Sequence, residues 1–142
     1  MQSKTDFIDL SLVSYLIVDR SASVLDSLAK TLRNFSATDV RETPDVEVAQ
    51  EMIRDRLPEI IFLGLASGRA GEIDFLRALR HGSNPPSLYI PAIILYEAVC
   101  VEETAAAIRL GADGFIAVPF SLAIVEANLL KVLHDSRSMH AD

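Results

Sequence analysis

The chain reads AIRLGADGFIAVPF over residues 107–120, and this stretch joins the end of a helix to a short strand. The helical spacing of residues 102–110 stops at Gly111, which lacks a Cβ and therefore suits the left-handed position that closes a helix. Residues 114–117 then form a short apolar run ahead of Pro119. This order of helix, tight turn and strand is typical of an α/β fold.

Three more apolar runs have the length of strands that are buried on both faces: residues 14–18, 59–63 and 92–95. Small or polar residues follow each run, and segments with helical spacing lie between them. Strand and helix therefore alternate, which predicts parallel pairing with right-handed crossovers. We expect an α/β fold with a doubly wound, five-stranded parallel sheet built from five β-α units.

Capping residues place the helix boundaries. Thr43 before Pro44 predicts an N-cap followed by proline at the first helical position, and Pro58 ends that helix. A further helix is expected over residues 72–80. Ser121 is expected to cap the last helix.

Composition limits the classes of function. The 142 residues fit one domain, and 20 acidic against 13 basic residues give a net charge of -7. Such a surface repels nucleic-acid phosphates and anionic lipid. No apolar stretch approaches the roughly 20 residues that span a bilayer, and the first ten residues lack the order of a secretory signal. Cys100 is the single cysteine, which agrees with a cytoplasmic location.

Residues 12–134 resemble the receiver domain of bacterial response regulators, the chemotaxis-type flavodoxin-like fold. The pieces that carry the resemblance are residues 16–19, 57–63, 91–95 and 107–115, the last of which runs into Pro119-Phe120. The resemblance implies the strand order 2-1-3-4-5 and a cis peptide bond between Val118 and Pro119. It leaves residues 1–11 as an N-terminal extension and residues 135–142 as a polar C-terminal tail.

The resemblance also implies where a phosphorylation pocket would lie, and most of its groups are missing. Receivers use an acidic pair after the first strand for Mg²⁺, an acceptor aspartate after the third, a hydroxyl after the fourth and a lysine after the fifth. Matched by strand position, these places hold Asp19 and Arg20, Gly64, Tyr96 and Val118. Only Asp19 keeps the family's chemistry.

These replacements work against phosphoryl transfer. Gly64 has no side chain to accept the group, Arg20 would repel the metal, and Val118 cannot neutralise charge on the transferred oxygens. The sequence therefore predicts a degenerate pseudo-receiver that is not an enzyme and uses no metal or other cofactor.

Two side chains are long enough to fill the space that metal and phosphate would otherwise occupy, Arg20 and Tyr96. One hypothesis has Arg20 pair with Asp19, or donate to backbone carbonyls near Gly64, in place of the metal. The alternative is that Arg20 points into solvent. We expect Phe115, at the aromatic position that couples the pocket of active receivers to their outer face, to reflect static packing.

An apolar segment at residues 96–101 lies where a surface loop is expected. Exposed apolar residues that gather on one face often mark a protein contact. The candidate interaction surface comprises Val99, Val101, Ala105, Ala106 and Phe115. Burial of Val99 or Val101 in the core is the rival interpretation.

The predicted function is that of a stand-alone, phosphorylation-incompetent receiver-like domain in bacterial two-component or phosphorelay signalling. It would act by protein contact on a histidine kinase, another response regulator or an effector, or as a homodimer, without binding nucleic acid or inserting into a membrane. The extended connection over residues 82–91 is a candidate for partner specificity.

Two alternatives remain open at this point. One is a sensor that binds a nucleotide second messenger. The nucleotide would bind at the glycine-rich loop 64–71 with Arg20 and Arg69 as the basic groups, or at the helical arginines Arg77 and Arg80. The other is a conventional phosphorylated regulator.

Overall fold

A computed structural model describes residues 7–66, 68–82 and 89–139. Its five strands form one parallel sheet in the order β2-β1-β3-β4-β5, which confirms the predicted topology. The strands are β1 (Ser14–Val18), β2 (Asp39–Thr43), β3 (Ile60–Gly64), β4 (Ala92–Tyr96) and β5 (Gly114–Ala117). The helices are α1 (Ala22–Asn34), α2 (Val46–Asp55), α3 (Gly71–His81), α4 (Val101–Arg109) and α5 (Leu122–Met139).

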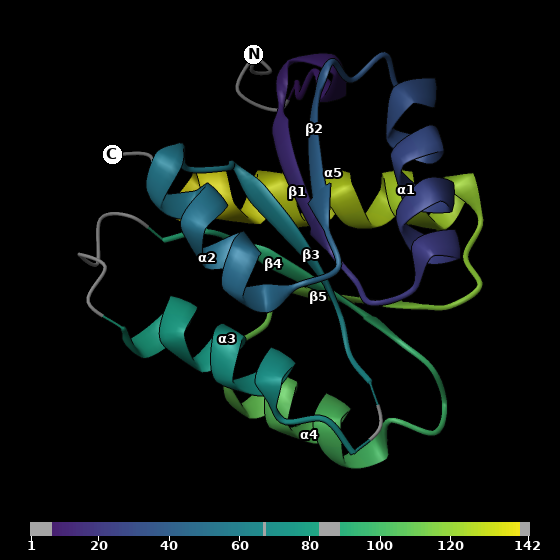
Figure 1. Ribbon diagram of the computed structural model, residues 1–142. Helices are drawn as coiled ribbons and strands as arrows, with labels where there is room; N and C mark the ends of the chain where they lie inside the picture. The colour runs from purple at the N-terminus through teal and green to yellow at the C-terminus, as the bar shows by residue number, and fades with distance from the viewer. Residues whose placement is uncertain (1–6, 67, 83–88, 140–142) are drawn as a thin grey trace.

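Helices cover both faces of the sheet, α1 and α5 on one side and α2, α3 and α4 on the other (Figure 1). Successive residues of a strand point to opposite faces, so each strand contributes to two separate cores. In β1, Tyr15 and Ile17 face α1 and α5, whereas Leu16 and Val18 face the other helices. Burial on both faces explains why the strands read as continuous apolar runs.

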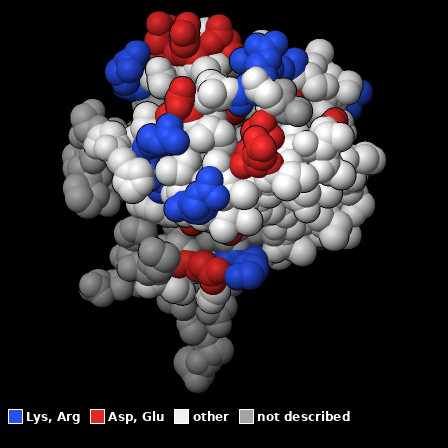
Figure 2. Space-filling model, turned by 90° about the horizontal axis from the view of Figure 1, so that it is seen from below, with Lys and Arg blue, Asp and Glu red and all other residues white. Residues whose placement is uncertain are grey.

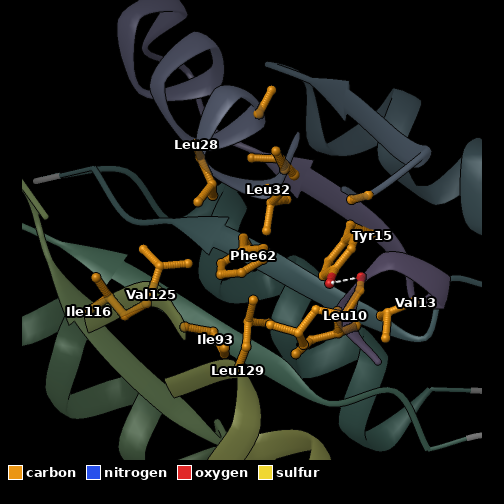
Figure 3. Packing of buried hydrophobic residues seen from close by; sticks show 14 of the residues in the cluster. Leu10, Val13, Tyr15, Leu28, Leu32, Phe62, Ile93, Ile116, Val125 and Leu129 are labelled. Atoms are coloured by element: carbon orange, nitrogen blue, oxygen red, sulfur yellow. Dashed lines mark hydrogen bonds between the residues drawn. The ribbon is translucent and has the colours of Figure 1, made fainter. Parts of the chain in front are cut away.

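The core beneath α1 and α5 is closed by residues that precede the first strand (Figure 3). Leu10, in a single 3-10 turn, is buried there, and its carbonyl accepts a 2.7 Å hydrogen bond from the Tyr15 hydroxyl. Burial raises the pKa of Tyr15 above its ordinary value, so the hydroxyl stays a donor. Part of the expected N-terminal extension thus belongs to the folded domain.

The predicted caps at Ser121 and Gly111 are correct, whereas the predicted start of α2 is not. Ser121 accepts a hydrogen bond from the Ile124 amide as the expected cap, and Gly111 has a φ of 84°. Thr43, however, ends β2, and the cap of α2 is Asp45, whose carboxylate accepts from the Glu47 amide.

Helix α5 continues past position 134 to Met139, so residues 135–139 are helical where a polar tail was expected. Most of the connection over residues 82–91 lies outside the described residues. No helix in the part of the chain that the structure describes is long and apolar enough to cross a membrane.

Candidate functional site

The carboxyl ends of β1, β3, β4 and β5 meet at one edge of the sheet, where ligands bind in open α/β folds. A pocket of about 240 Å³ opens there. All five residues matched to the receiver pocket line it: Asp19, Arg20, Gly64, Tyr96 and Val118. The structure therefore brings these five residues together around one pocket.

Asp19 reaches into the space beside Gly64. One of its oxygens accepts a 2.8 Å hydrogen bond from the Ser21 amide, and the other lies where a side chain on residue 64 would begin. A Cβ at Gly64 would overlap that oxygen, so glycine is needed for this placement of Asp19. Burial raises the pKa of Asp19, and the nearby charges of Glu72 and Glu97 raise it further.

Arg20 forms an ion pair with Glu72, in the first turn of α3. The Arg20 Nε lies 2.6 Å from the Glu72 Oε2, and the Glu72 side chain is only 3% exposed, against 41% for Arg20. Both hypotheses for Arg20 are therefore wrong: its partner is neither Asp19 nor a carbonyl near Gly64, and it does not simply point into solvent.

Glu72 was missed by the sequence analysis. An acidic residue in the first turn of a helix is common because it complements the helix dipole, so its position gave no sign of burial. Only one of its oxygens is satisfied. Oε1 is buried and has no hydrogen-bond partner among the described residues.

Tyr96 and Phe115 form the side of the site toward α4. Their rings meet edge to face, with centroids 6.4 Å apart and planes at 70°, and both rings are partly buried. Val118 lines the pocket with an apolar side chain and donates its amide to the Tyr96 carbonyl. The Val118–Pro119 peptide bond is cis, as expected from the resemblance.

The lining of the pocket combines two carboxylates with apolar side chains. Its carboxylates are Asp19 and the exposed Glu97, and its walls include Leu95, Val99 and Val118. Among the described residues, no group of three or more His, Cys, Asp and Glu side chains is arranged to hold a metal ion. The arrangement provides neither a phosphoryl acceptor at position 64 nor a cation at position 118.

The predicted interaction surface is exposed at its apolar end. Val99 and Val101 are 68% and 71% exposed, so the rival interpretation that buries them is wrong, and only Cys100 between them is buried. The other predicted members, Ala105, Ala106 and Phe115, are partly buried. Ile108, 60% exposed on α4, was missed.

The basic groups proposed for a nucleotide are mostly engaged elsewhere. The Arg80 side chain is only 6% exposed and pairs with Asp113 at 2.6 Å, and its guanidinium carbon lies over the Tyr89 ring, 4.3 Å from the ring centroid. Arg77 pairs with Asp74 on the surface of α3. Arg69 is exposed on the loop after β3. The predicted cluster of helical arginines therefore does not form an anion site.

Solved structures of receiver proteins share this architecture. A response-regulator chain from Chloroflexus aurantiacus has 24% identity and a TM-score of 0.73, over 85% of this chain and 97% of that one. The NtrX receiver domain from Brucella abortus has 26% identity and a TM-score of 0.72, over 84% and 98%.

Chemotaxis protein CheY4 of Vibrio cholerae, at 21% identity and a TM-score of 0.71, covers 84% of this chain and 98% of its own. No protein-family model matches the sequence, and no curated protein matches it. The neighbours establish the fold of a response-regulator receiver domain.

Proposed function

We propose that this receiver-like domain does not accept a phosphoryl group and acts through protein contacts in signal transduction. One observation carries the proposal: the position of the acceptor side chain is filled by Asp19 reaching over Gly64. This carboxylate belongs to the residue after β1, whereas the acceptor of receivers follows the third strand. The hydrogen bond that Asp19 accepts from the Ser21 amide holds it in place.

The electrostatics of the pocket support the same conclusion. Phosphoryl transfer relies on positioned cations, because charge spreads over the transferred oxygens. Here the guanidinium of Arg20 is engaged by Glu72, and the position after β5 is held by Val118. An incoming phosphate would instead meet the negative charges of Asp19 and Glu97.

Contact through α4 is favoured by its exposed apolar residues. Val99, Val101 and Ile108 lie on or beside one helix, and soluble domains seldom expose such a group without a use. Figure 2 views the molecule from the side of α3 and α4, and a broad area of that face carries no charged side chain. We assign partner binding to the exposed apolar residues on and beside α4.

A nucleotide sensor finds less support. Its binding site would need free arginines, yet Arg20 and Arg80 are both held in short ion pairs. Arg69 lies outside this pocket, in a separate hollow that it lines together with Glu102 and Glu103. This second function is therefore not adopted.

Intact-mass spectrometry after incubation with acetyl phosphate and Mg²⁺ tests the proposal. The chain should show no adduct under conditions in which a conventional receiver, treated in parallel, gains one phosphoryl group. A single acid-labile adduct on an aspartate of this chain would refute phosphorylation incompetence.

The Gly64→Asp variant makes the test sharper. The new carboxylate must displace Asp19, and Arg20 and Val118 still oppose metal and phosphate. We expect no Mg²⁺-dependent labelling, although the acceptor has been restored. Circular dichroism should show that the variant is folded, and robust labelling of the folded variant would contradict the argument.

A further inference from the structure

The pocket at the carboxyl ends of the strands holds negative charge that its own residues do not neutralise. Asp19 and Glu97 line it, and neither carboxylate forms an ion pair with another described residue. Arg20 also lines the pocket, but Glu72 engages it at 2.6 Å, so these two charges offset each other. The potential around Asp19 is therefore negative.

Asp19 also has room for a further hydrogen bond. Its Oδ1 accepts from the Ser21 amide, whereas Oδ2, beside Gly64, accepts from no donor among the described residues. Each oxygen of an ionised carboxylate accepts about two hydrogen bonds. A donor that enters the pocket therefore finds a free acceptor that is already charged.

Most of the remaining wall is apolar. Leu95, Val99 and Val118 contribute aliphatic side chains, and Tyr96 contributes an aromatic ring. The volume of about 240 Å³ exceeds the about 150 Å³ of an engineered cavity in another protein that binds benzene. A ligand that suits this pocket thus carries a short hydrocarbon part as well as a positive charge.

We propose that this pocket binds a primary alkylammonium ion, with the –NH₃⁺ group at Asp19 and Glu97 and the aliphatic chain against Val99 and Val118. An ammonium group supplies a compact positive charge and three donors, one of which satisfies the free oxygen of Asp19. The ring of Tyr96 adds a surface that attracts cations. The ammonium comes from a free amine or from a lysine side chain of a partner protein, which ends in the same group.

Other ligand classes fit the pocket less well. Mg²⁺ needs about six oxygen ligands in octahedral geometry, and no group of three or more His, Cys, Asp and Glu side chains in the described part of the chain is arranged to hold a metal ion. A phosphate meets the charges of Asp19 and Glu97. A quaternary ammonium has the charge but no hydrogen to donate.

Titration of the ¹⁵N-labelled full chain with n-butylammonium, followed by NMR at constant ionic strength, tests the proposal. We expect saturable shifts at the amides of Ser21, Gly64 and Tyr96, with a dissociation constant on the order of 1 mM. The Asp113 amide, at the opposite ends of the strands, should not move. Neutral n-butanol, anionic butyrate and tetramethylammonium should each bind at least about tenfold more weakly.

Asp19→Asn tests the charged acceptor and should raise the dissociation constant of n-butylammonium at least about tenfold. Asp26→Asn is the matched control, because it removes the same charge from an exposed surface pair with Lys30. Its dissociation constant should stay within about twofold of the wild type. This pair of variants separates a site at Asp19 from general attraction to a chain of net charge -7.

Two exposed valines test the position of the aliphatic chain. Val99 lines the pocket, whereas Val101 is equally exposed and does not line it. Val99→Lys places a competing ammonium at the pocket and should weaken binding at least about tenfold, but Val101→Lys should change it by less than about threefold. The amide spectrum of each variant shows whether it is folded.

A blocked lysine, Nα-acetyl-lysine methylamide, distinguishes the two sources of the ammonium. Binding within about threefold of n-butylammonium would assign the pocket to a lysine side chain, and binding at least about tenfold weaker would assign it to a free amine. Absence of saturable shifts with n-butylammonium, equal binding of n-butanol, or equal losses in Asp19→Asn and Asp26→Asn would overturn the proposal. The titration contains no phosphoryl donor, so this proposal and phosphorylation incompetence can fail separately.

Discussion

Two ion pairs with the same 2.6 Å separation lie at opposite edges of the sheet, and they differ in how completely they are satisfied. At the amino edge of β4 and β5, Asp113 accepts from Arg80, from the Ala92 amide and from the Tyr89 hydroxyl. Arg80 also donates to two backbone carbonyls. Both charges of this ion pair therefore have several partners.

The ion pair at the carboxyl ends of the strands is less completely hydrogen-bonded. Glu72 uses one oxygen for Arg20, while the other is buried without a partner among the described residues. Asp19 is partly desolvated, and two further carboxylates raise its pKa. The end of the sheet where ligands bind in open α/β folds is therefore the one whose buried carboxylate lacks a full set of partners, whereas the ion pair at the opposite end is fully hydrogen-bonded.

Arg80→Met should give the largest effect, because it breaks the satisfied network. Loss of a buried cation leaves its carboxylate partner uncompensated and costs about 3 kcal/mol of unfolding free energy. Urea denaturation measures this loss. Arg77→Met is the matched control on the same helix: its ion pair with Asp74 is exposed, and its loss should change stability by less than about 0.5 kcal/mol. Equal effects of the two substitutions would show that Arg80 is not structural.

Arg20→Met tests the other ion pair and should cost about 2 kcal/mol, because it leaves Glu72 as a buried carboxylate without a cation. Urea denaturation at pH 7.5 measures this loss of unfolding free energy.

Glu72→Gln added to Arg20→Met should recover most of the stability, since a neutral amide is easier to bury than a charge. Urea denaturation at pH 7.5 measures the free energy of unfolding of both variants. If the double variant is no more stable than Arg20→Met, Glu72 is not the group that Arg20 compensates.

The strands and the position of the pocket could be predicted from the sequence, whereas the contacts inside the pocket could not. The strands could be predicted because burial on both sheet faces gives continuous apolar runs. Since the carboxyl ends of parallel strands lie together, residues 19, 64, 96 and 118 meet at one pocket. The partner of Arg20 was not predictable, because burial of Glu72 depends on the packing of α3 against the sheet. Exposure of Val99 and Val101 was likewise open, since an apolar residue after a strand fits either core or surface.

Asp19→Asn should give the smallest change in the free energy of unfolding. The sign of this change should be opposite to that of Asp113→Asn, the same substitution at the amino ends of the strands. Because the folded state raises the pKa of Asp19, its ionisation opposes folding: stability is fully present below the ordinary carboxyl pKa and is lost as the pH rises through the raised value. Asparagine removes the charge, so the variant should be more stable than the wild type at pH 7.5, by less than about 1 kcal/mol because the site is partly solvated. The gain should shrink as the pH falls through the raised pKa of Asp19, because the protonated wild-type side chain carries no charge either.

At the amino edge, Asp113→Asn should instead destabilise the chain by about 1–2 kcal/mol. An amide nitrogen cannot accept from the donors that surround Asp113, namely Arg80, the Ala92 amide and the Tyr89 hydroxyl. Urea denaturation of both variants at pH 7.5 and pH 4.5 compares the two edges directly. Asp19→Asn could instead destabilise the chain at pH 7.5 by as much as Asp113→Asn. The charged Asp19 would then stabilise the fold, and the two ends of the sheet would not differ in the way proposed.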